Sequence, residues 1–173
     1  MARFIHLSQR ILYEDNHLLV INKLPGEIVQ GDKTGDKPLV ETAKDYIAQK
    51  YHKPGEVFLG VVHRLDRPVS GAIILARTSK ALERLNAMLQ ERKIQKTYWA
   101  IVKNKPPKDS DTLVNYIRRN ELKNKTIVLD HPTNNSSEAS LTYRVLAQSF
   151  NYYLLEIELH TGRHHQIRAQ LAI

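Results

Sequence analysis

The chain has a short charged loop between two apolar runs: VFLGVV at residues 57–62, HRLDRPVS at residues 63–70 and AIILA at residues 72–76. Apolar runs of this length, bounded by turn residues, are typical of buried strands. The loop carries Asp66 with Arg64 and Arg67 beside it. Rigid strands at both ends can hold such a carboxylate in place, as a functional site requires. The structural alternative is an exposed turn in which the aspartate and the arginines pair locally.

The rest of the chain alternates strand patterns with helical ones. Apolar runs and alternating residues predict strands at residues 18–23, 97–102, 141–145 and 153–159, with a pair of weaker strands over 112–130. Helical spacing predicts helices that begin at Pro38, at Thr78 or Ser79, and at Arg163. Hairpins interrupted by two main helices favour an α+β fold built on a largely antiparallel sheet.

Composition restricts the class of protein. The 173 residues have a formal net charge of +8 and contain no cysteine, which excludes disulfides and thiolate metal sites. No segment approaches the ~20 apolar residues of a membrane span, and the start lacks a signal-peptide layout, so we expect a soluble cytoplasmic protein. The positive charge favours a polyanionic partner such as nucleic acid, the alternative being a merely basic soluble protein.

Four segments in order resemble the RluA family of RNA pseudouridine synthases. The loop string resembles the family signature, in which His-Arg-Leu-Asp is followed by Arg-Pro or Lys-Pro, a small pair and Gly. The others are YEDN with the following LLVINK and Pro-Gly at residues 13–26, KTY at residues 96–98 and TGRHHQIR at residues 161–168. The resemblance implies the pseudouridine synthase fold, a mainly antiparallel mixed sheet with flanking helices and loops.

The resemblance also implies a reaction. Uridine in ribosomal or transfer RNA is detached at its glycosidic bond, rotated and rejoined through carbon 5, without a metal or other cofactor. Asp66 is then the essential carboxylate, either as nucleophile or as stabiliser of the sugar intermediate. Arg168 matches the position that pairs with this aspartate. Tyr98 matches the tyrosine that packs against the target base, although the same residue can be read as a core aromatic of its strand.

RNA binding is expected to use further residues of the same motifs. Arg64 matches the residue that displaces the target base from its stack, or it can act as a simple phosphate clamp. The complete set predicted to bind the substrate is His63, Arg64, Arg67, Arg163 and Ile167. A basic turn is expected to extend the RNA track: Arg118, Arg119, Lys123 and Lys125.

The histidines raise the possibility of a metal site. His160, His164 and His165 cluster in the sequence, yet no His-Glu-x-x-His spacing is present. On a helix that begins at Arg163, the adjacent His164 and His165 would point to different faces. We therefore expect no metal. His164 stands where the family usually has threonine.

The resemblance predicts one catalytic domain over residues 1–173, without the C-terminal strands of the family and without an N-terminal RNA-binding domain. No obligate protein partner or membrane association is inferred. Two other functions are considered as alternatives to pseudouridine formation. One is a catalytically silent RNA-binding module of the same fold, and the other is a metal-dependent nuclease or hydrolase that uses Asp66 and the histidines.

Overall fold

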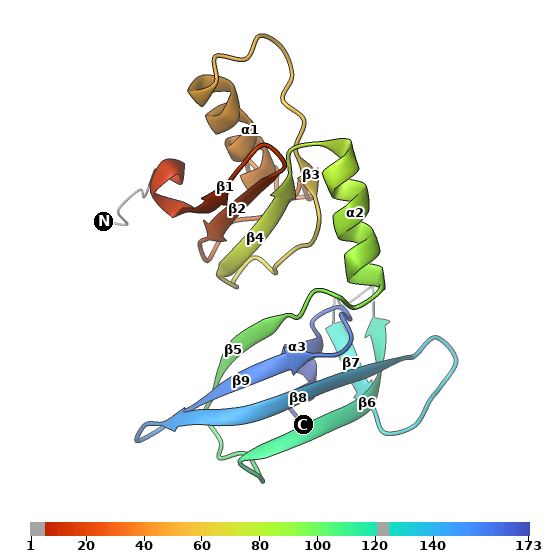
Figure 1. Cartoon of the computed structure of the whole chain (residues 1–173). Helices are drawn as coiled ribbons and strands as arrows, with labels where there is room; N and C mark the ends of the chain where they lie inside the picture. Colours follow the sequence, from red (N-terminus) through yellow and green to blue (C-terminus); the bar gives the residue numbers. More distant parts are fainter. Residues whose placement is uncertain (1–5, 121–124) are drawn as a thin grey trace. The chain divides into compact units, whose positions relative to one another are not determined.

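A computed structural model describes residues 6–120 and 125–173 of the chain. Contacts divide the chain into two compact units, Met1–Glu91 and Arg92–Ile173, each with its own antiparallel sheet (Figure 1). The α+β class is confirmed, whereas a single domain over residues 1–173 stays a prediction. Lys123 of the expected basic turn lies outside the described residues.

Unit 1 contains a four-stranded sheet and two main helices. In chain order its elements are η1 (Leu7–Arg10), β1 (Ile11–Glu14), β2 (Leu18–Lys23), α1 (Leu39–Lys50), β3 (Gly60–Val61), β4 (Gly71–Ala76) and α2 (Ser79–Gln90). The strand order is β1-β2-β4-β3, and each pair is antiparallel. Helices α1 and α2 are the two predicted from spacing, with Thr78 capping α2 through its side chain.

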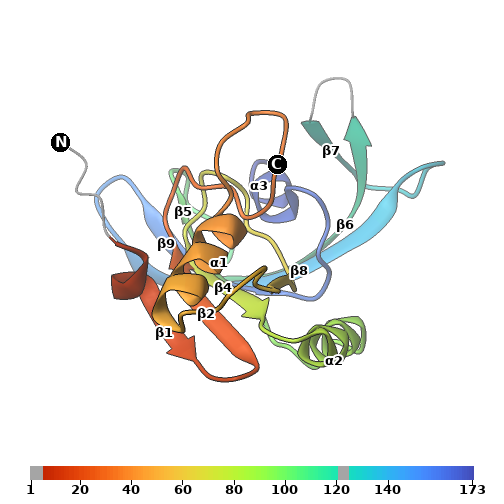
Figure 2. The same cartoon turned by 90° about the horizontal axis from the view of Figure 1, so that it is seen from above.

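The core of unit 1 lies between α1 and one face of its sheet (Figure 2). Helix α1 begins after Pro38, whose ring suits the start of a helix. Its apolar residues recur at helical spacing and are buried against alternate residues of β2 and β4: Leu39, Val40, Ala43 and Ile47 against Leu19, Ile21, Ile73 and Leu75. The helical period of 3.6 residues and the strand period of two thus place the apolar residues of α1, β2 and β4 in one core cluster.

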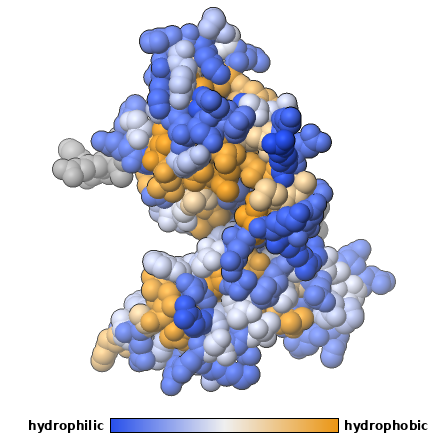
Figure 3. Space-filling view, in the orientation of Figure 1, coloured by the Kyte–Doolittle hydropathy of each residue, from blue (hydrophilic) through white to orange (hydrophobic). Residues whose placement is uncertain are grey.

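The other face of this sheet is less covered. Leu18, Val20 and Ile74 point to it and are half-buried. Apolar surface gathers there, over the part of unit 1 that holds β2 and β4 (Figure 3). Helix α2 reaches the sheet at β3, where a Cβ on Gly60 would lie 2.6 Å from a methyl carbon of Leu82. A larger residue at position 60 would therefore force the Leu82 side chain to move.

The predicted strand over residues 57–62 is wrong in length. Only Gly60 and Val61 pair with β4, and Phe58 is exposed. The chain joins the sheet at an edge for two residues and then leaves it to form the Asp66 loop. An apolar run alone does not reveal this, because pairing depends on where the neighbouring strand lies.

Unit 2 contains a five-stranded antiparallel sheet and one short helix. Its elements are β5 (Thr97–Val102), β6 (Ser110–Asn120), β7 (Lys125–Leu129), β8 (Ser137–Gln148), β9 (Tyr153–Leu159) and α3 (Gln166–Gln170). The strand order is β5-β9-β8-β6-β7. The strands expected at residues 97–102, 141–145 and 153–159 and the hairpin over 112–130 are all present.

One face of the unit 2 sheet carries a core cluster and α3. Strand alternation places the buried residues on this face: Leu141, Tyr143, Leu155 and Ile157, with Ile167 and Leu171 packed over them. Trp99 and Ile101 lie on the opposite face and are exposed. None of the helices in the described part of the chain is both long and apolar enough to cross a bilayer.

Candidate active site

A buried lysine at the end of β2 holds the backbone of the Asp66 loop. Lys23 has no exposed surface, and its ammonium group lies within hydrogen-bond distance of four backbone carbonyl oxygens. These belong to Leu24 (3.1 Å), Asp66 (3.3 Å), Arg67 (3.1 Å) and Val69 (2.6 Å). Three N–H groups thus serve four acceptors, which ties the end of β2 to three residues of the loop.

Lys23 is a functional candidate that the motif comparison does not single out. Burial lowers the pKa of its ammonium below the ordinary lysine value, and the negative charges of Glu27 and Asp66 oppose that shift. The sequence did contain a signal, since period-2 alternation puts Lys23 on the buried side of β2 with Leu19 and Ile21. A lysine on the buried face of a strand is rare unless its charge is satisfied.

Further contacts hold the backbone of the loop while some of its side chains remain accessible. The amide of Val69 donates to the carbonyl of Asp66 at 2.9 Å, which closes a turn, and Gly26 donates to Arg67 at 2.8 Å. Arg64 and Arg67 are exposed, and Asp66 is half-buried. Arg67 pairs with Asp36 at 2.7 Å, an exposed ion pair that contributes little stability and can give way to a phosphate.

The side chain of His63 accepts a hydrogen bond from β4 just beyond the end of β3. Val61 is the last residue of β3 paired with β4, opposite Leu75. At the next position of β4, the backbone N–H of Ile74 donates to Nε2 of His63 at 3.1 Å. This bond requires an unprotonated Nε2, and it fastens the start of the Asp66 loop to β4. An RNA contact of His63 stays a prediction.

We expect His63→Ala to lower the free energy of unfolding by about 1–3 kcal/mol, because the part-buried N–H of Ile74 would lose its acceptor. His63→Gln should recover most of this loss, since its amide oxygen can reach a similar position and accept the same bond. Denaturant unfolding of both variants measures the effect, with exposed His17→Ala as the control. Equal stability of the alanine variant and the wild type would contradict the assigned contact.

In unit 2, the predicted residues gather on one side of the sheet. Tyr98 and Ile167 both pack against the core cluster, on the face that α3 covers. Arg168 lies in α3 and is exposed. Arg163 is exposed as well, and its Nε donates to the carbonyl of Glu138 at 2.9 Å. The structure thus brings together the predicted residues of the second and third motifs.

Two buried glutamines shape the third motif. The side-chain oxygen of Gln166 accepts from the Thr161 hydroxyl at 2.8 Å and from the Arg163 amide at 2.9 Å. The side chain of Gln170 donates to Asn115 Oδ1 at 2.9 Å and to the Ala139 carbonyl at 3.1 Å. These bonds hold the turn and α3 on the sheet. Gln166 belongs to the third-motif string, but neither glutamine was among the predicted site residues, and the polar character of both gave no signal of burial.

The predicted orientation of His164 and His165 is wrong. Helix α3 begins at Gln166, three residues after the expected start at Arg163. His165 has a left-handed backbone (φ +51°), so the helix cannot extend back through this residue to Arg163. The two imidazole rings stack with centroids 3.5 Å apart, and Thr126 of β7 donates to the His164 carbonyl at 3.0 Å. The histidines therefore belong to a turn attached to β7.

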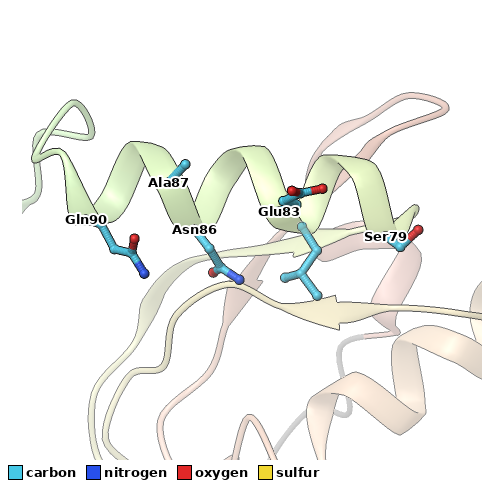
Figure 4. A pocket seen from close by; sticks show the side chains of 6 residues that line it. Ser79, Glu83, Asn86, Ala87 and Gln90 are labelled. Carbon is cyan, nitrogen blue, oxygen red and sulfur yellow. The ribbon is translucent and has the colours of Figure 1, made fainter.

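A surface pocket lies in unit 1. It is lined by residues of α2 alone: Ser79, Leu82, Glu83, Asn86, Ala87 and Gln90 (Figure 4). A pocket lined by a single helix cannot surround a base, and none of the residues predicted from the sequence motifs lines it. The pocket therefore gives no reason to place the site on α2.

The sequence profile of the family described as RNA pseudouridylate synthase matches residues 17–173, which include the Asp66 loop and the third motif. The chain belongs to this family. The solved structure of human RNA pseudouridylate synthase domain containing 4 is similar, with a TM-score of 0.81 and 25% sequence identity over 96% of the chain and 64% of that protein. The expected pseudouridine synthase fold is confirmed.

Relatives in the family include enzymes named for ribosomal and transfer RNA. Ribosomal large subunit pseudouridine synthase C of Buchnera aphidicola subsp. Acyrthosiphon pisum is 37% identical over 94% of the chain and 50% of its own length. tRNA pseudouridine synthase C of Pectobacterium carotovorum is 30% identical over 94% of the chain and 44% of its own length. The chain thus spans about half the length of these relatives.

Proposed function

We propose that this protein isomerises specific uridines in ribosomal or transfer RNA to pseudouridine, with Asp66 as the essential carboxylate. The family match and the names of the relatives support the reaction. The observation that carries the role of Asp66 is the anchoring of its loop by Lys23. A buried cation that holds three loop carbonyls costs desolvation energy, and it pre-organises a carboxylate for chemistry.

The proposed division of labour follows the positions of the side chains within each unit. Asp66 acts at the sugar, either as nucleophile or by stabilising positive charge there. Arg64, exposed on the same loop, contacts RNA phosphate or the space left by the extracted base. Tyr98 and Arg168, on the α3 side of the unit 2 sheet, contact the base and supply a cation for Asp66. That these side chains meet in one cleft is part of the proposal.

The test is a map of pseudouridine in total RNA from cells with and without the gene. We expect the loss of one or a few sites, which the wild-type gene restores and an Asp66→Asn gene does not. Unchanged maps would contradict the proposed function. In vitro, activity in excess chelator distinguishes this reaction from metal-dependent hydrolysis, since a hydrolase of that class would stop.

A further inference from the structure

The hairpin of β6 and β7 is attached to the third motif through one of its two faces. Asn115 of β6 accepts from Gln170 of α3 at 2.9 Å, and Thr126 of β7 donates to the carbonyl of His164 at 3.0 Å. Both side chains therefore lie on the face of the sheet that carries α3. Helix α3 packs against these same two strands (Figure 2).

The strand register then separates two neighbouring arginines. Arg119 is paired with Thr126, and residues directly opposite in an antiparallel pair share a face. Arg119 also lies four residues from Asn115, so alternation places it on that same face. Arg118 is paired with Ile127 and points to the opposite face. Both arginine side chains are exposed.

The two faces also differ in charge. On the α3 face, the described strands of this sheet carry one carboxylate, Asp111, near the far end of β6 and paired with Lys108 at 2.9 Å. Eight residues separate it from Arg119, roughly 26 Å along a strand. The opposite face carries three carboxylates, Glu138, Glu156 and Glu158, and three cations, Arg118, Lys125 and Arg144, so the charges of its described strands balance.

Arg118 is close to one of these carboxylates. Glu138 is paired with Tyr116, two residues before Arg118 on the same face, so the two charged side chains are diagonal neighbours. Arg119 instead shares its face with the third-motif turn, which contains the exposed Arg163 and no acidic residue. Arg163 and Arg168 of the third motif add positive charge to the α3 face, whereas the charges of the opposite face balance, so a polyanion is attracted to the α3 face more than to the opposite one.

We propose that Arg119 contacts RNA phosphate in a track on the α3 face of the unit 2 sheet, next to the third motif, and that Arg118 lies outside this track. The assignment rests on the proposed function, since RNA is the polyanion in question. It narrows the expectation that the basic turn as a whole extends the RNA track. A guanidinium can bind a phosphate through two parallel hydrogen bonds. The hydrogen bond from Thr126 to His164 fixes β7, the strand whose Thr126 is paired with Arg119.

The test compares Arg119→Gln with the matched control Arg118→Gln, which removes the same charge one residue away. Binding of a labelled stem-loop RNA is measured by fluorescence anisotropy over a range of KCl concentrations. We expect Arg119→Gln to weaken binding about 3- to 10-fold and to lower the log–log salt slope by about 0.7–0.9, the value for one phosphate contact. Arg118→Gln should leave both quantities near the wild-type values, and Arg119→Lys should keep most of the slope.

Equal losses in both glutamine variants, or no loss in either, would overturn the assignment of Arg119. If the RNA map nevertheless loses sites in cells without the gene, the proposed function stands and only the track is wrong. If the wild-type protein neither binds RNA nor changes the map, both proposals fail. Unchanged circular dichroism and melting temperature of the variants show that the comparison concerns folded protein.

Discussion

Asp66→Asn is expected to lower pseudouridine formation by at least about 10³-fold, because removal of a group that acts at the reacting centre costs this much or more. The amide is close to the carboxylate in size, and the loop is held through backbone carbonyls that the substitution leaves in place. RNA affinity should therefore change little, since phosphate contacts supply most of it. A single-turnover assay with a substrate RNA, together with a binding titration, measures the two quantities separately.

The matched control is Asp45→Asn, which removes an exposed carboxylate from α1 in the same unit. It should retain wild-type turnover. Substantial turnover of Asp66→Asn would remove the central role from this residue. A parallel loss of RNA binding and turnover would instead show that the loop carries affinity, which favours the reading as a binding module.

Lys23→Met is expected to lower the free energy of unfolding by roughly 2–4 kcal/mol, since four carbonyl oxygens lose a charged donor, although those of Asp66 and Arg67 each keep a backbone N–H donor. Methionine is unbranched and flexible, like the lysine stem, so the effect comes mainly from the lost ammonium. The same change frees the backbone of the Asp66 loop from β2. We therefore expect turnover to fall more than RNA affinity, measured below the lowered melting temperature so that the variant remains folded.

Lys80→Met, an exposed substitution at the start of α2, is the control for loss of one positive charge. Its stability and turnover should match those of the wild type. A Lys23→Met variant as stable as this control would show that the four carbonyl contacts contribute nothing. A destabilised variant with full turnover would show that Lys23 supports the fold of unit 1 but does not position Asp66.

Local patterns determined much of this protein. A short apolar run predicted β2, and the alternation of apolar residues predicted β5, β8 and β9, because side chains on a strand point to opposite faces at every step. Helical spacing and the cap at Thr78 predicted α1 and α2 for a similarly local reason. The loop string around Asp66 and the third motif were sufficient to indicate the family, which the profile match then showed.

Features that depend on pairing between distant segments emerged only in three dimensions. The strand before Asp66 is short because only two of its residues pair with β4. At the next position of β4, the N–H of Ile74 donates to the side chain of His63 instead of to a strand carbonyl. Likewise, α3 begins late because Gln166 uses its side chain to close the turn before it. Ile74 lies 11 residues from His63, and Gln166 bonds to residues three and five positions away through its side chain, so the spacing of apolar residues reveals neither feature.

The basic hairpin shows the same division most clearly. The sequence alone identified a cluster of positive charge, and it treated Arg118 and Arg119 as equivalent. Alternation along a strand implies that two adjacent residues point to opposite faces, but it does not say which face carries α3. The pairing of Arg119 with Thr126, and the bond from Thr126 to His164, decided that question. Charge and periodicity can be read from the sequence, whereas the face of the sheet on which α3 packs is known only from the tertiary structure.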